Sequence, residues 1–343
     1  MASNVSQPVY FHVLLLAFVI LHSLPQAKSC ANHTLDATFS QLHLPAGCYG
    51  PSSITFDHKG EGPYVGAGDG RIFKYDADTT QFKEYCVGNS HRSRKSCDAV
   101  DLTKAPTACG RPMGLSFDQK SGDMYYVDAI YGLQRVKSGG GGVAQPVCSS
   151  VGGSPLSFPS SVSTGGSNGE LYFTDYSRKY NLKNFYSSLT NNTVDSTGRL
   201  MTYDTNTKQT KVLADNLNGA AGCVPSKDGS FVLVTELMGK TVKKYWTKGP
   251  KAGTSEHFRT LDGFPTGLKA TPEGDFWLTM NQMNGDKKTT SPMCIKMDHT
   301  GKDLHTVDLS SKYSEQFVTG VEEKAGKLYV GSTSTPYVGV YKL

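Results

Sequence analysis

The stretch that decides the fold is Gly122–Asp128, which reads GDMYYVD. A glycine is followed by a nearly unbroken run of aromatic, aliphatic and β-branched residues, a pattern typical of a turn that leads into a strand buried on both faces. The pattern occurs six times, at intervals of about 50 residues. The other copies are GPYVG at 62–66, GELYFTD at 169–175, GSFVLV at 229–234, GDFWLT at 274–279 and GKLYVG at 326–331.

Most copies are followed by a second strand pattern, such as GRIFKYD at 70–76 and GRLMTYD at 198–204. Six copies, each long enough for about four strands, predict an all-β fold and specifically a six-bladed β-propeller. Two β-sandwich domains are the alternative, but no linker separates the halves of the chain. The glycine-rich stretch 138–143 lies between strand patterns and is interpreted as a hairpin turn.

The composition excludes several other classes of protein. The chain has 343 residues, of which 10% are aromatic and 19% charged, and disordered chains combine few aromatics with a large net charge. There is no strict glycine period and no heptad pattern, which excludes collagen and coiled coils. The net charge of +5 is too small and too scattered to predict nucleic-acid binding.

The N-terminus carries a short apolar run, Val13–Leu21, followed by Pro25 and small residues. The run is far below the roughly 20 residues that a membrane-spanning helix needs. Residues 1–29 are therefore predicted to be a secretory signal peptide cleaved after Ser29, with a buried strand as the alternative. Residues 30–343 are predicted to form the single propeller domain, soluble in the secretory pathway and without a membrane span.

The eight cysteines fit an oxidising compartment. Their spacing matches no zinc site. Cys97 and Cys109 are the favoured disulfide pair because they bracket a polar loop; Cys30 with Cys48 is a second possibility, and the others are expected to be buried thiols. Asn32 and Asn191 begin N-x-T sequons and are predicted glycosylation sites.

The usual nucleotide-binding, zinc-protease and nucleophile-elbow motifs are absent from the sequence, and no cofactor is predicted. The carboxylates are more informative. Asp128, Asp175 and Glu236 follow the apolar strand at nearly the same place in three copies. In a propeller they can meet at one mouth of the central channel, where mutual repulsion and poor solvation suit acid–base catalysis. The alternative is that each carboxylate caps a turn by accepting backbone N–H groups.

Several segments resemble the strictosidine synthase-like proteins of plants. They include CGRPMGLSF at 109–117, YVDAIYGL at 126–133, LYFTD at 171–175 and, most specifically, KYWTKGPKAGT at 244–254. The resemblance runs from about residue 45 to the C-terminus. It implies a six-bladed propeller, a secretory route that commonly ends in the vacuole, and a Cys97–Cys109 disulfide. The founding enzyme of that family condenses tryptamine with the aldehyde of secologanin.

The resemblance also indicates a changed site. The family's catalytic glutamate corresponds to Val318 or Thr319, and the histidine before it to Gln316, while Glu315 matches a non-catalytic glutamate. A pocket tyrosine of the family falls near Ser160, beside Phe158. Strictosidine synthesis itself is therefore not expected.

Related propellers of the lactonase type hold Ca²⁺ with oxygen ligands at the channel centre. The corresponding positions here supply no carboxylate, so no metal site is expected. They are Ser52, Ser160, Ala221 and Thr266.

Three hypotheses follow. The first is an enzyme of plant specialised metabolism that acts on a small molecule by metal-free condensation, cyclisation or isomerisation. The second is an ester or lactone hydrolase, and the third a non-catalytic binding or defence-associated propeller. For the first, the candidate bases are Asp128, Asp175, Glu236 and Glu315, and the candidate substrate-binding residues are Tyr131, Phe158, Ser160, Leu237, Phe317 and Thr319. The vacuole is the expected location and the cell exterior the alternative; no oligomeric state is predicted.

Overall fold

The computed structural model describes residues 38–100, 106–165, 169–185, 194–285 and 289–343. The predicted signal peptide, Cys30 and the sequons at Asn32 and Asn191 lie outside the described residues, so those assignments stay predictions. None of the helices in the described residues has both the length and the apolar character needed to cross a bilayer.

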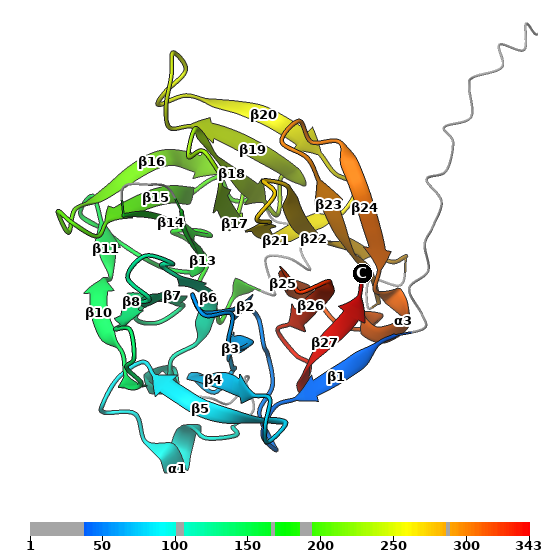
Figure 1. Ribbon diagram of the computed structural model, residues 1–343. Coiled ribbons are helices and arrows are strands. Elements are labelled where there is room, and N and C mark those ends of the chain that lie inside the picture. Colours follow the sequence, from blue (N-terminus) through cyan, green and yellow to red (C-terminus); the bar gives the residue numbers. More distant parts are fainter. Residues whose placement is uncertain (1–37, 101–105, 166–168, 186–193, 286–288) are drawn as a thin grey trace, which may run out of the picture. The chain divides into compact units, whose positions relative to one another are not determined.

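The described residues form six main sheets arranged in a ring, which confirms the six-bladed β-propeller (Figure 1). Apart from the short β9, the strands of each main sheet run antiparallel, and strands that follow one another within a sheet are hydrogen-bonded neighbours. The first sheet contains β2 (Ile54–Thr55), β3 (Tyr64–Gly66), β4 (Arg71–Asp76) and β5 (Gln81–Val87), with the short β9 (Gly142–Val143) added parallel to β5. The second contains β6 (Pro112–Phe117), β7 (Met124–Asp128), β8 (Gly132–Val136) and β10 (Gln145–Cys148).

The next three sheets have four strands each. They are β13 (Pro159–Thr164), β14 (Glu170–Asp175), β15 (Gly198–Asp204) and β16 (Thr210–Leu217); β17 (Ala220–Pro225), β18 (Phe231–Glu236), β19 (Thr241–Trp246) and β20 (Ser255–Thr260); and β21 (Phe264–Ala270), β22 (Phe276–Met283), β23 (Thr290–Met297) and β24 (Asp303–Asp308). A two-stranded ribbon, β11 (Ser150–Val151) with β12 (Ser154–Pro155), precedes β13.

The last sheet closes the ring with strands from both ends of the described chain. β25 (Val318–Lys324), β26 (Lys327–Ser332) and β27 (Tyr337–Lys342) are joined by β1 (Ser40–His43), which pairs antiparallel with β27. This ladder ties the two ends of the propeller together through backbone hydrogen bonds and covers an edge that would otherwise be exposed.

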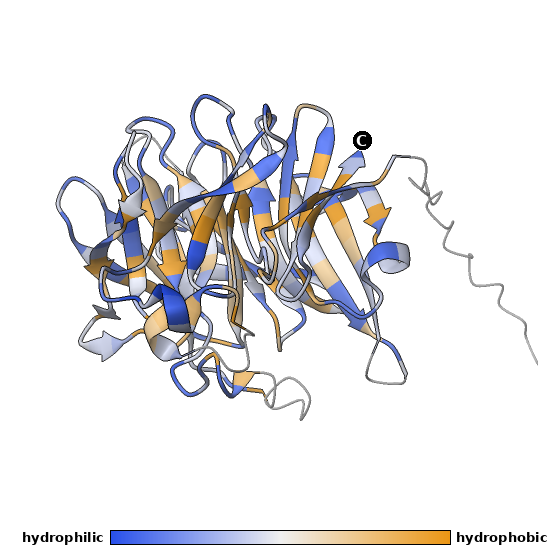
Figure 2. Ribbon diagram, turned by 90° about the horizontal axis from the view of Figure 1, so that it is seen from below, coloured by the Kyte–Doolittle hydropathy of each residue, from blue (hydrophilic) through white to orange (hydrophobic). Residues whose placement is uncertain are grey.

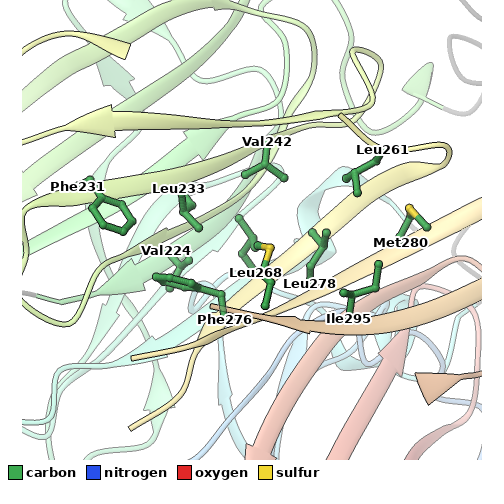
Figure 3. Packing of buried hydrophobic residues seen from close by; sticks show 11 residues of the cluster. Val224, Phe231, Leu233, Val242, Leu261, Leu268, Phe276, Leu278, Met280 and Ile295 are labelled. Atoms are coloured by element: carbon green, nitrogen blue, oxygen red, sulfur yellow. The ribbon is translucent and has the colours of Figure 1, made fainter. Parts of the chain in front are cut away.

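Apolar side chains fill the space between neighbouring sheets. Figure 3 shows one such layer, in which Phe231 and Leu233 of β18 pack against Phe276 and Leu278 of β22 and against Leu268 of β21. The near-continuous apolar runs of the six repeats follow from this arrangement, because each central strand is covered on both faces by the adjacent blades. Polar residues gather in the connecting loops, while apolar bands lie within the strands (Figure 2).

The predicted disulfide is present. Cys97 ends the short helix α1 (Arg94–Cys97) and Cys109 ends the 3₁₀ turn η1 (Thr107–Cys109), with their Cα atoms 5.4 Å apart. The remaining described cysteines are free thiols, which are Cys48, Cys86, Cys148, Cys223 and Cys294.

Each blade is joined to the next by hydroxyl side chains, most of which lie on the innermost strands; Ser52 precedes β2, and Thr235 lies on β18. The innermost strands of adjacent blades lie side by side but do not share a backbone ladder, so their inner-edge carbonyls need other donors. A serine or threonine supplies a bond at each of the six junctions. The pairs are Ser52 Oγ–Pro112 O (3.1 Å), Thr164 Oγ1–Phe117 O (2.6 Å), Ser160 Oγ–Ala221 O (2.9 Å), Thr235 Oγ1–Thr266 O (2.9 Å), Thr266 Oγ1–Val318 O (2.8 Å) and Thr319 Oγ1–Ser52 O (2.9 Å).

Thr235 offers a direct test of these junctions. Its buried hydroxyl accepts the Gly222 N–H at 2.6 Å and donates to the Thr266 carbonyl at 2.9 Å. Thr235→Val keeps the shape but leaves the Gly222 N–H without that acceptor, and we expect a loss of about 1–3 kcal/mol in the free energy of unfolding, measured by urea denaturation. Thr235→Ser retains the hydroxyl as a control. A valine variant as stable as the wild type would contradict the role assigned to the hydroxyl.

Candidate functional site

A cavity lies at the centre of the ring. The empty space there is about 760 Å³ when the open solvent at its mouth is included, and the room for the centres of water-sized molecules is about 80 Å³. Its wall comes from the innermost strands β6, β13, β17, β21 and β25 and from residues next to the inner strands. Residues from segments far apart in the sequence therefore meet here, as expected for a propeller channel.

Aromatic and aliphatic side chains form one part of the wall. Phe158, immediately before β13, contacts the rings of Tyr176 and Phe185 edge-on, with centroid distances of 5.6 and 5.3 Å. Leu237, after β18, and Phe317, before β25, belong to the same apolar cluster. These five side chains, called the aromatic wall below, favour an apolar or aromatic ligand.

Hydroxyl groups form a second part of the wall. Ser52, Ser160, Thr266 and Thr319 all line the cavity, and each already donates to a carbonyl of a neighbouring blade. Ala221, which the resemblance groups with Ser52, Ser160 and Thr266, also lines the cavity. Among the described residues, no group of three or more His, Cys, Asp or Glu side chains is placed to hold a metal ion.

Lys269 brings a charge to the cavity. It is part of the cavity lining on β21, and its Nζ lies 3.2 Å from Glu322 Oε2 on β25 and 3.2 Å from the Leu115 carbonyl on β6. Burial raises the pKa of Glu322, and the neighbouring Lys269 ammonium opposes that rise. The side chains of Lys269 and Glu322 are 17% and 20% exposed, so the pair is only partly solvated.

Asp128, Asp175 and Glu236 are buried at the ends of their strands and are absent from the cavity lining. Each accepts backbone N–H from its own blade, and Asp128 also accepts from the turn that follows its strand. Asp128 accepts from Arg111, Ile130 and Tyr131 at 2.8 to 3.1 Å. Burial raises its pKa to about 6, and those three bonds act in the opposite direction.

Asp175 and Glu236 are held in the same way. Asp175 accepts the Phe158 N–H at 2.8 Å and forms an ion pair with Arg199 at 2.7 Å. Burial raises the pKa of Asp175, and Arg199 opposes this. Glu236 accepts from Asn218 N–H and Thr241 Oγ1, both at 2.8 Å, and lies 3.2 Å from Lys243 Nζ.

The other candidates divide between the cavity and the surface. Phe158, Ser160, Leu237, Phe317 and Thr319 line the cavity. Glu315 is exposed after helix α3 (Ser310–Tyr313) and is not part of the lining. Tyr131 is also absent from the cavity lining, and its hydroxyl donates to the Ala108 carbonyl at 2.7 Å.

Sequence reasoning missed Lys269, Tyr176 and Phe185. Lys269 carries no motif, and its contact with Leu115 joins residues 154 positions apart. Tyr176 directly follows the LYFTD strand, and this position after a repeat could have identified it as a candidate residue of the cavity.

Comparison with known proteins identifies the family. The strictosidine synthase profile matches residues 162–250. Strictosidine synthase-like protein 12 of Arabidopsis thaliana is 36% identical over 309 residues, which are 90% of this chain and 91% of that protein. The chain belongs to the strictosidine synthase-like family.

Strictosidine synthase of Catharanthus roseus is itself 32% identical over 303 residues, covering 88% of this chain and 85% of that enzyme. Among solved structures, the calcium-binding protein regucalcin from Agrobacterium tumefaciens is similar in fold, with a TM-score of 0.57 at 11% identity over 90% of this chain and 92% of that one.

In this strictosidine synthase-like chain, the two positions that the resemblance assigns to the catalytic glutamate differ in environment. Val318 is fully buried, and its backbone exchanges hydrogen bonds with the Asn281 side chain at 2.8 and 2.9 Å. Thr319 lines the cavity, and its hydroxyl donates to the Ser52 carbonyl at 2.9 Å.

Asp175→Asn tests whether this carboxylate is structural. The substitution leaves the buried Arg199 guanidinium without its charge partner, and we expect a loss of about 3 kcal/mol in the free energy of unfolding by urea denaturation. Asp215→Asn, at an exposed position, should change stability by less than about 0.5 kcal/mol. Equal stability of the Asp175→Asn variant and the wild type would show that the Asp175–Arg199 ion pair does not stabilise the fold.

Proposed function

We propose that this protein carries out a metal-free condensation, cyclisation or isomerisation of a small, largely apolar molecule of plant specialised metabolism. The observation that carries the proposal is the cavity at the centre of the ring, which combines an aromatic wall with hydroxyls already engaged in protein hydrogen bonds. Membership of a family that includes strictosidine synthase supports a carbonyl condensation as the reaction class.

Such a condensation makes defined demands on the site. An unprotonated amine attacks the carbonyl carbon, a C–N bond forms, and the carbonyl oxygen leaves as water. In a cyclisation, a nucleophilic carbon of the same molecule then attacks the iminium and loses a proton. The aromatic wall would hold the reacting parts together, because orientation of two partners supplies a large share of the rate.

The proposed location is the vacuole, reached through the secretory pathway, with the cell exterior as the alternative. It rests on the apolar run Val13–Leu21 and on the two sequons. The Cys97–Cys109 bond is consistent with an oxidising compartment.

A second candidate function is non-catalytic binding of the same kind of molecule. The observation in its favour is that the expected bases Asp128, Asp175 and Glu236 each accept a backbone N–H from the segment just before the innermost strand of their blade.

Ala221→Phe tests the proposal without removing any acidic or basic group. Ala221 lines the cavity, and a phenyl ring there fills the space that the ligand needs. Arylethylamines are incubated with aldehydes, and mass spectrometry follows the product whose mass is the sum of the two minus water. We expect wild-type protein to form such a product and the variant to form it roughly tenfold more slowly or worse, since overpacking excludes the ligand.

Ala252→Phe, at an exposed position, is the matched control and should match the wild type. EDTA should leave the rate unchanged; loss of the condensation product with the chelator would contradict the metal-free mechanism. Binding without product in the wild type would favour the non-catalytic candidate. Equal rates in the Ala221→Phe and wild-type proteins would reject the channel as the site.

A further inference from the structure

The side chain of Lys269 extends from its own blade toward the blade on the opposite side of the channel. Going round the ring through neighbouring inner strands, β21 is followed by β25, β2 and β6, so β6 lies opposite β21. The Lys269 ammonium, carried by β21, donates to the Leu115 carbonyl on β6 at 3.2 Å. The lysine side chain therefore spans the channel between opposite blades (Figure 1 shows these strands).

Lys269 lies further along β21 than Thr266, whose hydroxyl is one of those that join neighbouring blades. Thr266 and Lys269 are three residues apart on β21, and the irregular register between Pro265 and Leu268 makes their separation shorter than the roughly 10 Å of three regular strand residues. Both residues line the same cavity. A ligand lying along the channel can thus contact the aromatic wall with its apolar body and reach Lys269 with a polar end.

The ammonium has hydrogen-bonding capacity left for a ligand. A lysine ammonium carries three N–H donors. Within the described part of the chain, Lys269 has two polar partners, the Leu115 carbonyl and the Glu322 carboxylate. The third N–H can donate to one acceptor of a bound molecule.

The charge of Glu322 determines which acceptor fits. Its carboxylate lies 3.2 Å from the Lys269 ammonium and compensates that positive charge. A carboxylate ligand at Lys269 would also lie close to Glu322 and be repelled by it, whereas an uncharged carbonyl oxygen needs only the donor.

We propose that Lys269 binds the carbonyl oxygen of an apolar ketone or aldehyde seated in the channel, and that Glu322 makes the site prefer an uncharged carbonyl to a carboxylate. The inference rests on the proposed function, since it names the substrate class of the same cavity. A donor fixed at the carbonyl oxygen also polarises the carbonyl for attack by an amine.

Three probes with a phenyl ring and a short chain separate the contributions. Butylbenzene reports the apolar cavity alone, 4-phenyl-2-butanone adds a ketone, and 3-phenylpropanoate adds a carboxylate. Dissociation constants are measured by isothermal titration calorimetry on the wild type. The ketone should bind roughly tenfold to a hundredfold more tightly than butylbenzene, the range expected for a hydrogen bond from a charged donor, and more tightly than the carboxylate.

Two variants then test the residues. Lys269→Met keeps the length of the side chain but removes the N–H donors. The variant should bind the ketone only as tightly as butylbenzene, and its affinity for butylbenzene should equal that of the wild type. Glu322→Gln leaves the ammonium uncompensated and should reverse the preference, so that 3-phenylpropanoate binds more tightly than the ketone. Lys342→Met, on an exposed part of β27, is the control and should behave like the wild type.

The outcomes separate the two proposals. If none of the probes binds the wild type, both the proposed function and this inference fail. Butylbenzene that binds as tightly as the ketone rejects this inference alone. A Glu322→Gln variant that still prefers the ketone rejects the role of Glu322. If the Lys269→Met variant does not fold, as judged by thermal denaturation, the wild-type series and Glu322→Gln still decide the question.

Discussion

The hydrogen bonds between neighbouring blades are the interaction on which the rest of the structure depends. An inner strand has a ladder partner on its outer side only, so its other edge turns unpaired backbone groups toward the channel. Short hydroxyl side chains, such as those of Ser160, Thr266 and Thr319, bridge from one blade to a carbonyl of the next. Because these bonds hold adjacent inner strands in contact, they set the width of the channel and the positions of the groups that line it.

The same arrangement explains which charged groups are available to a ligand. Carboxylates at the ends of the central strands, of which Asp175 is an example, are buried and accept backbone N–H groups from the segment that leads into the innermost strand of the same blade. Their oxygens already accept hydrogen bonds, and none of these residues is part of the cavity lining. Lys269 differs because it crosses the channel and keeps one donor. A largely apolar cavity with one charged donor then selects ligands by shape and by the polar group that meets this donor.

Much of the fold was predictable from local sequence, because a turn glycine followed by an apolar strand is a short-range pattern. The GDMYYVD, GELYFTD and GDFWLT copies each begin or precede a central strand of a separate blade, and their spacing predicts the number of blades. The site was less predictable. That Asp128 follows its strand is visible in the sequence, but whether its carboxylate points to the channel or to its own turn depends on the loop after it. Lys269 and Leu115 meet only because opposite blades face each other, and no local pattern records that.

The central claim is that the ring of blades encloses an apolar cavity that admits a small molecule. X-ray diffraction from crystals soaked in bromobenzene tests it most directly, since the anomalous signal of bromine locates the ligand without any assumption about turnover. Apolar cavities of sufficient size bind such molecules. The account predicts a bromine peak between Phe158, Leu237 and Phe317. A cavity filled by side chains or by a network of ordered water, with no bromine in it, would contradict the account.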